Sequence, residues 1–166
     1  MVKAKYSIVA GGVLVAGVIA FFIFSQSEEA KVKKQFEFLA EKIGKTPEES
    51  QIIAAAKANR IREVFTETCK IHAPAYSFSR DISSDELPTL VLSARSQCSE
   101  ISLKFCDFVI DFPEKGTALV NLTASMESKL TTGEFIEEHH ELKCKLQKIE
   151  DIWRLKEIEM VEVLKK

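Results

Sequence analysis

The side chains best suited to acid–base chemistry are Glu138 and His140, which stand two residues apart. The alternating pattern around them is typical of a β-strand, so both are expected on one face, with His139 on the other. A carboxylate beside an imidazole can orient it as a general base. Two more polar side chains, Tyr76 and Asp107, complete the candidate pocket. The competing interpretation is a solvated or hydrogen-bonded histidine, so the sequence alone assigns no catalytic residue.

The histidines and cysteines do not have the spacing of a metal site. Neighbours on a strand point to opposite faces, so His139 and His140 form no chelating pair. The four cysteines, none of them in a CxxC motif, are Cys69, Cys98, Cys106 and Cys144. We predict four packed thiols, no metal and no cofactor. A Cys69–Cys98 disulfide stays open as the alternative, whereas Cys106 and Cys144 fall two strands apart, too far for a bridge.

The elements that must position these residues are predicted most clearly in the last third of the chain. Between Glu100 and Val163 the sequence predicts four successive antiparallel strands, and residues 118–126 alternate strictly between apolar and polar. The turns are expected at residues 113–116, 131–134 and 150–151, where glycine, proline and acidic residues gather. The alternation slips near residues 106–107 and again between Leu155 and Ile158, which predicts two bulges and a strongly curved sheet.

Upstream segments are predicted to supply helices that cover the apolar face of this sheet. Residues 28–45 read as a charged amphipathic stalk helix, with Val32, Phe36, Leu39 and Ile43 on one stripe. A second helix is expected from Pro47 to about Ile71, and a third over residues 87–98 behind a capping box at Ser83. Between them, residues 75–79 are predicted to form a short edge strand.

The N-terminal segment is apolar without interruption from Ile8 to Phe24. That length just spans a bilayer core, which predicts a single transmembrane anchor in residues 1–27. The residues taken to represent the anchor are Ile8, Leu14, Ile19, Phe22 and Phe24. A cleaved signal peptide is the alternative. Since a short tail precedes one span and a large domain, the domain is expected on the periplasmic or extracellular side of the membrane.

Composition and charge exclude one class of partner. The chain has 166 residues, 46% of them hydrophobic and 29% charged, as expected for a folded protein. The formal charge is −2, with 23 basic and 25 acidic residues, and only Lys3 and Lys5 precede the first acidic residue, Glu28. Residues 28–166 therefore carry a formal charge of −4, which argues against binding nucleic acid through bulk electrostatics.

The order of these elements resembles the nuclear transport factor 2-like superfamily. The likeness covers about residues 47–164 and rests on the helix–strand–helix–meander order, the strand from Gly116 to Met126, and Trp153 at the opening of the last strand. The resemblance implies an α+β fold in which a four- to five-stranded sheet curls as a cone around two or three helices and often leaves a pocket. The predicted domains are therefore an anchor (1–27), a stalk helix (28–45) and a cone-shaped domain (46–166).

Three functional hypotheses follow, because this superfamily contains both enzymes and binding domains. The preferred one is a membrane-anchored, non-catalytic domain that binds a protein partner or a small apolar ligand. The first alternative is a pocket enzyme of the isomerase, dehydratase or hydrolase type, with His140 as base and Glu138 as its orienting group. The second is an envelope assembly subunit acting as a homodimer, similar to the bitopic assembly subunits of type IV secretion systems. A buried carboxylate or histidine with apolar walls would favour the enzyme, because catalysis needs a shifted pKa, whereas an interior plugged by Phe, Leu and Met would favour the binding or scaffold domain.

Overall fold

The computed structural model describes residues 2–161 of the chain, with side chains for residues 14–23 and 27–161. The chain divides into two compact units, Met1–Lys33 and Lys34–Lys166. One long helix, α1 (Val2–Ile43), runs through the first unit and ends in the second. The second unit holds every strand and the other helices, and the candidate pocket residues all lie in it.

The prediction of a single-pass membrane protein is contradicted. Within the side chains that the structure describes, no helix is both long enough and apolar enough to cross a membrane. In the N-terminal half of α1, the described side chains include the apolar run of residues 14–23. Leu14, Ile19 and Phe22 belong to that run, whereas the side chains of Ile8 and Phe24 lie outside the described residues.

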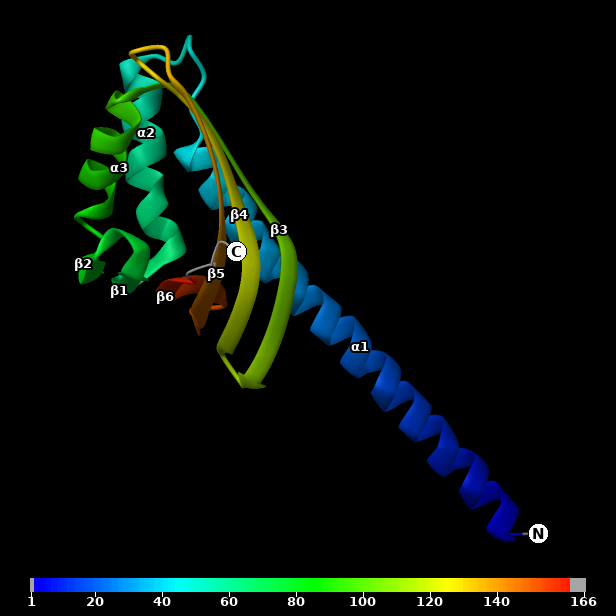
Figure 1. Cartoon of the computed structure of the whole chain (residues 1–166). Coiled ribbons are helices and arrows are strands. Elements are labelled where there is room, and N and C mark those ends of the chain that lie inside the picture. The colour runs from blue at the N-terminus through cyan, green and yellow to red at the C-terminus, as the bar shows by residue number, and fades with distance from the viewer. Residues whose placement is uncertain (1, 162–166) are drawn as a thin grey trace, which may run out of the picture. The chain divides into compact units, whose positions relative to one another are not determined.

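The sheet of the second unit has six strands, not four or five. Four form the expected meander: β3 (Cys98–Glu114), β4 (Thr117–Leu130), β5 (Phe135–Ile149) and β6 (Ile152–Val161). Two more, β1 (Phe65–Ala73) and β2 (Phe78–Ser83), join beside β6 and give the order β2-β1-β6-β5-β4-β3. Figure 1 shows the long strands β3, β4 and β5 curving together. The α+β class is thus confirmed, with a larger sheet than predicted.

The helix predicted up to residue 71 is wrong in its second half. Helix α2 covers only Gln51–Ile61, and a short 3-10 turn, η1 (Arg62–Val64), leads directly into β1. Ile61, Phe65 and Cys69 are spaced by four, which fits a helical stripe, but Phe65 and Cys69 also share one face of a strand. Pairing of β1 with both β2 and β6 decides the outcome, and Thr66 and Thr68 favour a strand because they are β-branched.

The meander behaves as its pattern predicts. Ala118, Val120 and Leu122 of β4 are buried while the residues between them are exposed. The register of β3 against β4 shifts between Cys106 and Val109, and that of β6 against β5 shifts between Leu155 and Glu157. These shifts are the two predicted bulges, and they bend the strands. Glu150 and Asp151 both adopt positive φ, as the two central residues of a type I′ hairpin turn require.

Helical residues cover part of the inner face of this curved sheet. Phe36, near the end of α1, is 1% exposed and packs edge-on against Phe105 and Phe108 of β3, with ring centroids 5.3 and 5.5 Å apart. Helix α3 (Leu87–Ser96) lies beside α2 and precedes β3 (Figure 1). Aromatic contacts of this geometry add about 1 kcal/mol beyond simple burial, so they help to fix α1 against β3.

All four cysteines are free thiols; Cys69, Cys98 and Cys144 are buried as predicted, whereas Cys106 is exposed. Burial, with the negative charges of Glu157 and Asp81, raises the pKa of Cys69 to about 12. Burial likewise raises the pKa of Cys144 to about 12. Because the thiolate is the reactive form, neither Cys69 nor Cys144 serves as a nucleophile near neutral pH.

Candidate functional site

The inner face of the sheet contains a cavity of about 340 Å³. Its apolar walls come from four strands: Leu103 of β3, Ala124 and Met126 of β4, Leu142 of β5 and Met160 of β6. Its polar lining is Tyr76, Glu138 and His140. A mostly apolar cavity with a few converging polar groups is the usual form of a small-molecule site, and this volume is at the low end for such sites.

Strand β5 supplies two of the three polar groups. Glu138 and His140 point inward because they are two residues apart on the strand, as the sequence predicts. Their contact joins Nε2 of His140 to Oε2 of Glu138 at 3.3 Å, and both side chains are partly buried. His140 lies directly opposite Ala124 of β4, whose small side chain leaves space in front of the imidazole.

Tyr76 reaches the same cavity from a distant part of the chain. It ends η2 (Pro74–Tyr76), a 3-10 turn where an edge strand was predicted, and Ser77 then adopts a left-handed conformation that turns the chain into β2. The phenolic oxygen lies 3.4 Å from Nε2 of His140. Burial first, and then the charge of Glu138 and a hydrogen bond with it, raises the pKa of Tyr76. The phenol therefore keeps its proton at neutral pH.

The three groups fix which nitrogen of His140 carries a proton. A carboxylate only accepts hydrogen bonds, so the contact with Glu138 requires the proton to sit on Nε2. With Nε2–H as a donor, the hydroxyl of Tyr76 donates to Glu138, in keeping with the hydrogen bond that raises its pKa. The neutral imidazole then has its lone pair on Nδ1, which is the nitrogen able to accept a proton.

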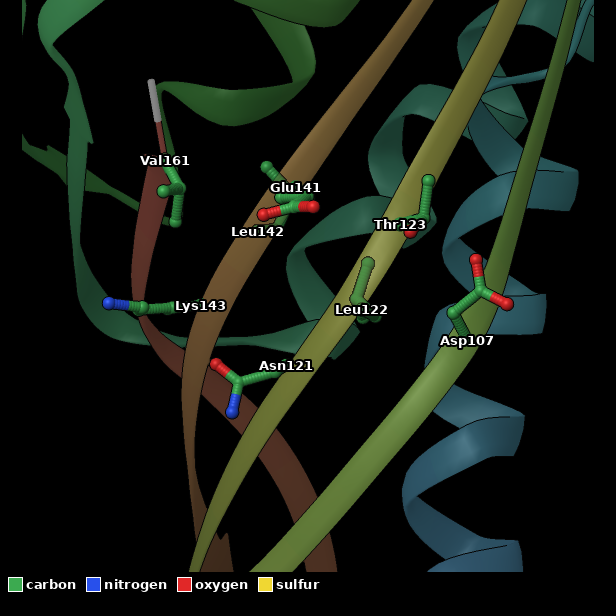
Figure 2. Close-up of a pocket in the computed structure, with 8 residues that line it drawn as sticks. All are labelled: Asp107, Asn121, Leu122, Thr123, Glu141, Leu142, Lys143 and Val161. Carbon is green, nitrogen blue, oxygen red and sulfur yellow. The ribbon is translucent and has the colours of Figure 1, made fainter. Parts of the chain in front are cut away.

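Asp107, the fourth candidate, lies away from this cluster. It occupies the bulge of β3 with a φ of 55°, and its Oδ2 lies 3.5 Å from Sγ of Cys106. It lines a separate pocket of about 410 Å³ together with residues of β4, β5 and β6. Figure 2 shows it on β3, with Asn121 and Thr123 on β4 and Glu141 and Lys143 on β5. The structure thus brings together three of the four predicted residues.

The cavity walls are residues that the sequence places on the inner face but does not identify as a site. Leu103, Ala124, Met126, Leu142 and Met160 all occupy inward positions of the predicted alternation. The same alternation describes the solid core, where Ala118 and Leu146 are fully buried. A periodic pattern does not encode which inward positions other elements cover and which they leave open. Within the described residues, no group of three or more histidine, cysteine or acidic side chains forms a metal site.

Comparisons with known proteins give the fold a context. No family model matches the sequence, and no curated protein matches it. Solved structures do match. Kfla4162 from Kribbella flavida has a TM-score of 0.69 at 12% identity, covering 82% of this chain and 91% of its own. A candidate scytalone dehydratase from Novosphingobium aromaticivorans also has a TM-score of 0.69, at 13% identity, covering 84% of this chain and 87% of its own.

A third match is the hexachlorocyclohexane dehydrochlorinase LinA-type3 from Novosphingobium barchaimii, with a TM-score of 0.64 at 5% identity. It covers 82% of this chain and 87% of its own. At such low identity the likeness shows the fold alone, an α+β arrangement with a curved, mostly antiparallel sheet as predicted from the sequence.

The preferred hypothesis of a membrane-anchored, non-catalytic binding or scaffold domain is wrong. No described helix could span a membrane, and the proteins of like fold include a dehydratase and a dehydrochlorinase. The interior meets the condition set for the enzyme alternative only in part: the walls around the histidine and the carboxylate are apolar, but the two side chains keep 27% and 37% of their surface exposed.

Proposed function

We propose that this protein is a small-molecule enzyme of the lyase or isomerase type, in which His140 removes a proton from carbon. The observation that carries the proposal is the cluster of Tyr76, Glu138 and His140 on an apolar cavity. An imidazole held by a carboxylate in such a place has the parts of a general base, which contributes about 10²- to 10⁴-fold to a rate.

The proposed step begins at Nδ1 of His140, the nitrogen without a proton. Nδ1 takes a proton from a C–H bond of the substrate, and the electron pair of that bond forms a new double bond. In an elimination, the leaving group departs from the neighbouring carbon with its own bonding pair. Glu138 stabilises the imidazolium through the Nε2 hydrogen bond, which makes it a positioning residue.

The apolar walls favour the proton transfer. Beside apolar walls, the charge that develops on the partly buried imidazole interacts more strongly with the Glu138 carboxylate than it would in bulk solvent. Proteins of the same fold named as a dehydratase and a dehydrochlorinase are both named for eliminations. An elimination is therefore the first reaction to test.

The test is a turnover screen of the full chain against ring compounds, some neutral and some bearing an amine, that carry a hydroxyl or chloride next to an activated C–H bond. Formation of the alkene is followed by mass spectrometry, and exchange of the substrate proton in D₂O is followed by NMR. The matched variants are His140→Ala and His139→Ala, because these histidines are neighbours on opposite faces of β5.

We expect His140→Ala to lower the rate about 10²- to 10⁴-fold and His139→Ala to leave it within about twofold, since His139 pairs with Glu137 outside the cavity at 3.1 Å. Equal rates in the two variants would contradict the proposal, as would the absence of both turnover and proton exchange across the screen.

A further inference from the structure

The charged side chains that line the cavity determine whether it favours a positively or a negatively charged ligand. Among the described residues that line it, Glu138 is the one acidic side chain, and neither lysine nor arginine is present. Residues 28–166 are also acidic overall, with a formal charge of −4. The local field and the surrounding field therefore both favour a positive charge over a negative one inside the cavity.

The hydrogen-bonding capacity of Glu138 is only partly used. A carboxylate offers about four lone-pair positions. The Nε2–H of His140 and the hydroxyl of Tyr76 occupy two of them. The side chain of Glu138 keeps 37% of its surface exposed, so water reaches it while the cavity is empty. A ligand that fills the cavity displaces that water, and a charged group left without a partner then costs several kcal/mol.

Three ligands of the same shape but different charge interact with this site differently. An acid places a second negative charge beside Glu138 and is repelled. An alcohol replaces part of the lost hydration with one neutral hydrogen bond. An ammonium group donates up to three hydrogen bonds and neutralises the carboxylate, while its apolar body packs against Leu103, Met126 and Met160.

We propose that the cavity takes a lipophilic amine, whose ammonium group binds the carboxylate of Glu138. This inference deepens the proposed function and rests on it, because it names the charge class of the substrate that the same cavity receives. The aromatic ring of Tyr76 strengthens the preference, since a cation near the face of a tyrosine is attracted by the ring. His140 remains the base and takes no part in holding the ammonium group.

The test compares three small probes that share one ring: benzylamine, benzyl alcohol and benzoate. Binding of each to the full chain is measured at pH 7 by NMR titration. Charge-assisted hydrogen bonds contribute more than neutral ones, so we expect benzylamine to bind roughly tenfold more tightly than benzyl alcohol, and benzoate to bind most weakly. Glu138→Gln should abolish the preference for the amine, whereas Glu137→Gln, on the opposite face of β5, should leave it intact.

Three outcomes would overturn the inference. They are equal binding of amine and alcohol, an amine preference that survives Glu138→Gln, and failure of all three probes to bind. His140→Ala separates this inference from the proposed function, because it should remove turnover and keep the preference for benzylamine. Loss of turnover without any amine preference would reject only the ligand class, and an amine preference without turnover would reject only the reaction.

Discussion

Two polar clusters in the second unit use similar groups to opposite effect. The buried cluster is Arg95, Glu49, Lys57 and Lys45, and the cavity cluster is Tyr76, Glu138 and His140. In the buried cluster, Arg95 and Glu49 each keep only 3% of their side-chain surface exposed and form an ion pair. In the cavity cluster, His140 and Glu138 keep 27% and 37% and face empty space.

The buried cluster is bonded to several elements, although Nε of Arg95 is buried without a hydrogen-bond partner among the described residues. Arg95 donates to the last carbonyls around the end of α1, those of Lys42, Ile43 and Gly44. Lys45 donates to the carbonyls of Arg95 and Cys98 at 2.9 and 2.6 Å. These bonds satisfy the free end of a helix and join it to α3 and β3. A buried cluster that joins a helix end to its neighbours stabilises a fold, whereas a partly exposed cluster beside a cavity is available for chemistry.

The largest expected effect is on stability, at the buried cluster. Arg95→Met leaves Glu49 buried beside Lys57 alone and the α1 carbonyls without donors, which costs about 3–5 kcal/mol of unfolding free energy. Denaturant unfolding measures this loss of unfolding free energy. The control is Arg80→Met, which breaks the exposed pair with Glu86 and costs at most about 1 kcal/mol. Similar losses in the two variants would contradict the distinction between a buried and an exposed pair.

Enlarging an alanine should separate the cavity from the core. In Ala124→Leu the larger side chain projects into the cavity. We expect benzylamine to bind more than tenfold more weakly, while the free energy of unfolding changes by less than about 1 kcal/mol. The control is Ala118→Leu on the same face of β4, where Ala118 is fully buried in the core. Overpacking there should cost about 1–3 kcal/mol. If Ala124→Leu were the more destabilising variant, the cavity would not be open space.

Acid should weaken the buried cluster through Glu49. Burial alone would raise the pKa of this carboxyl, but the hydrogen bonds and charges of Lys57 and Arg95 outweigh burial and lower it. A carboxyl with a lowered pKa in the folded state stabilises the protein above its unfolded pKa, about 4.3, and the contribution is lost as the pH falls further. Glu49→Gln should therefore flatten the decline in unfolding free energy below about pH 4.5. An unchanged decline would show that other carboxylates cause it.

The smallest expected effect concerns the hydroxyl of Tyr76. Tyr76→Phe removes one hydrogen bond to a partly exposed cluster, which is equivalent to about 1 kcal/mol. Turnover should fall about fivefold, with no change in unfolding free energy. Because the pKa of Tyr76 is raised, the rate should not depend on phenol ionisation near neutral pH. A loss as large as that of His140→Ala would make Tyr76, and not the imidazole, the principal proton-transfer group.

The sequence predicts local geometry well where one strand face is buried. The alternation in β4, the bulge at Cys106–Asp107 and the shared face of Glu138 and His140 all follow from the side-chain period of two. It fails where one spacing fits two structures, as at Ile61, Phe65 and Cys69, because pairing with β2 and β6 is a tertiary choice.

The meeting of Tyr76 with His140 depends on chain segments 64 residues apart. Nothing in the local pattern of residues 74–77 fixes the direction of the phenol, because a short turn and a left-handed serine set it. Asp107 shows the converse error: the bulge was predicted, yet the same bulge holds its carboxylate in a different pocket. A candidate list drawn from polarity alone cannot separate such cases.

The most direct test of the account is the position of the imidazole proton on His140. Long-range ¹H–¹⁵N spectra of the full chain at pH 8 report it, and a compound turned over in the screen can be added to the same sample. The account predicts the proton on Nε2, no proton on Nδ1, and a shift of the His140 signals on addition while those of His139 stay in place. A proton on Nδ1, or equal shifts of both histidines, would contradict it.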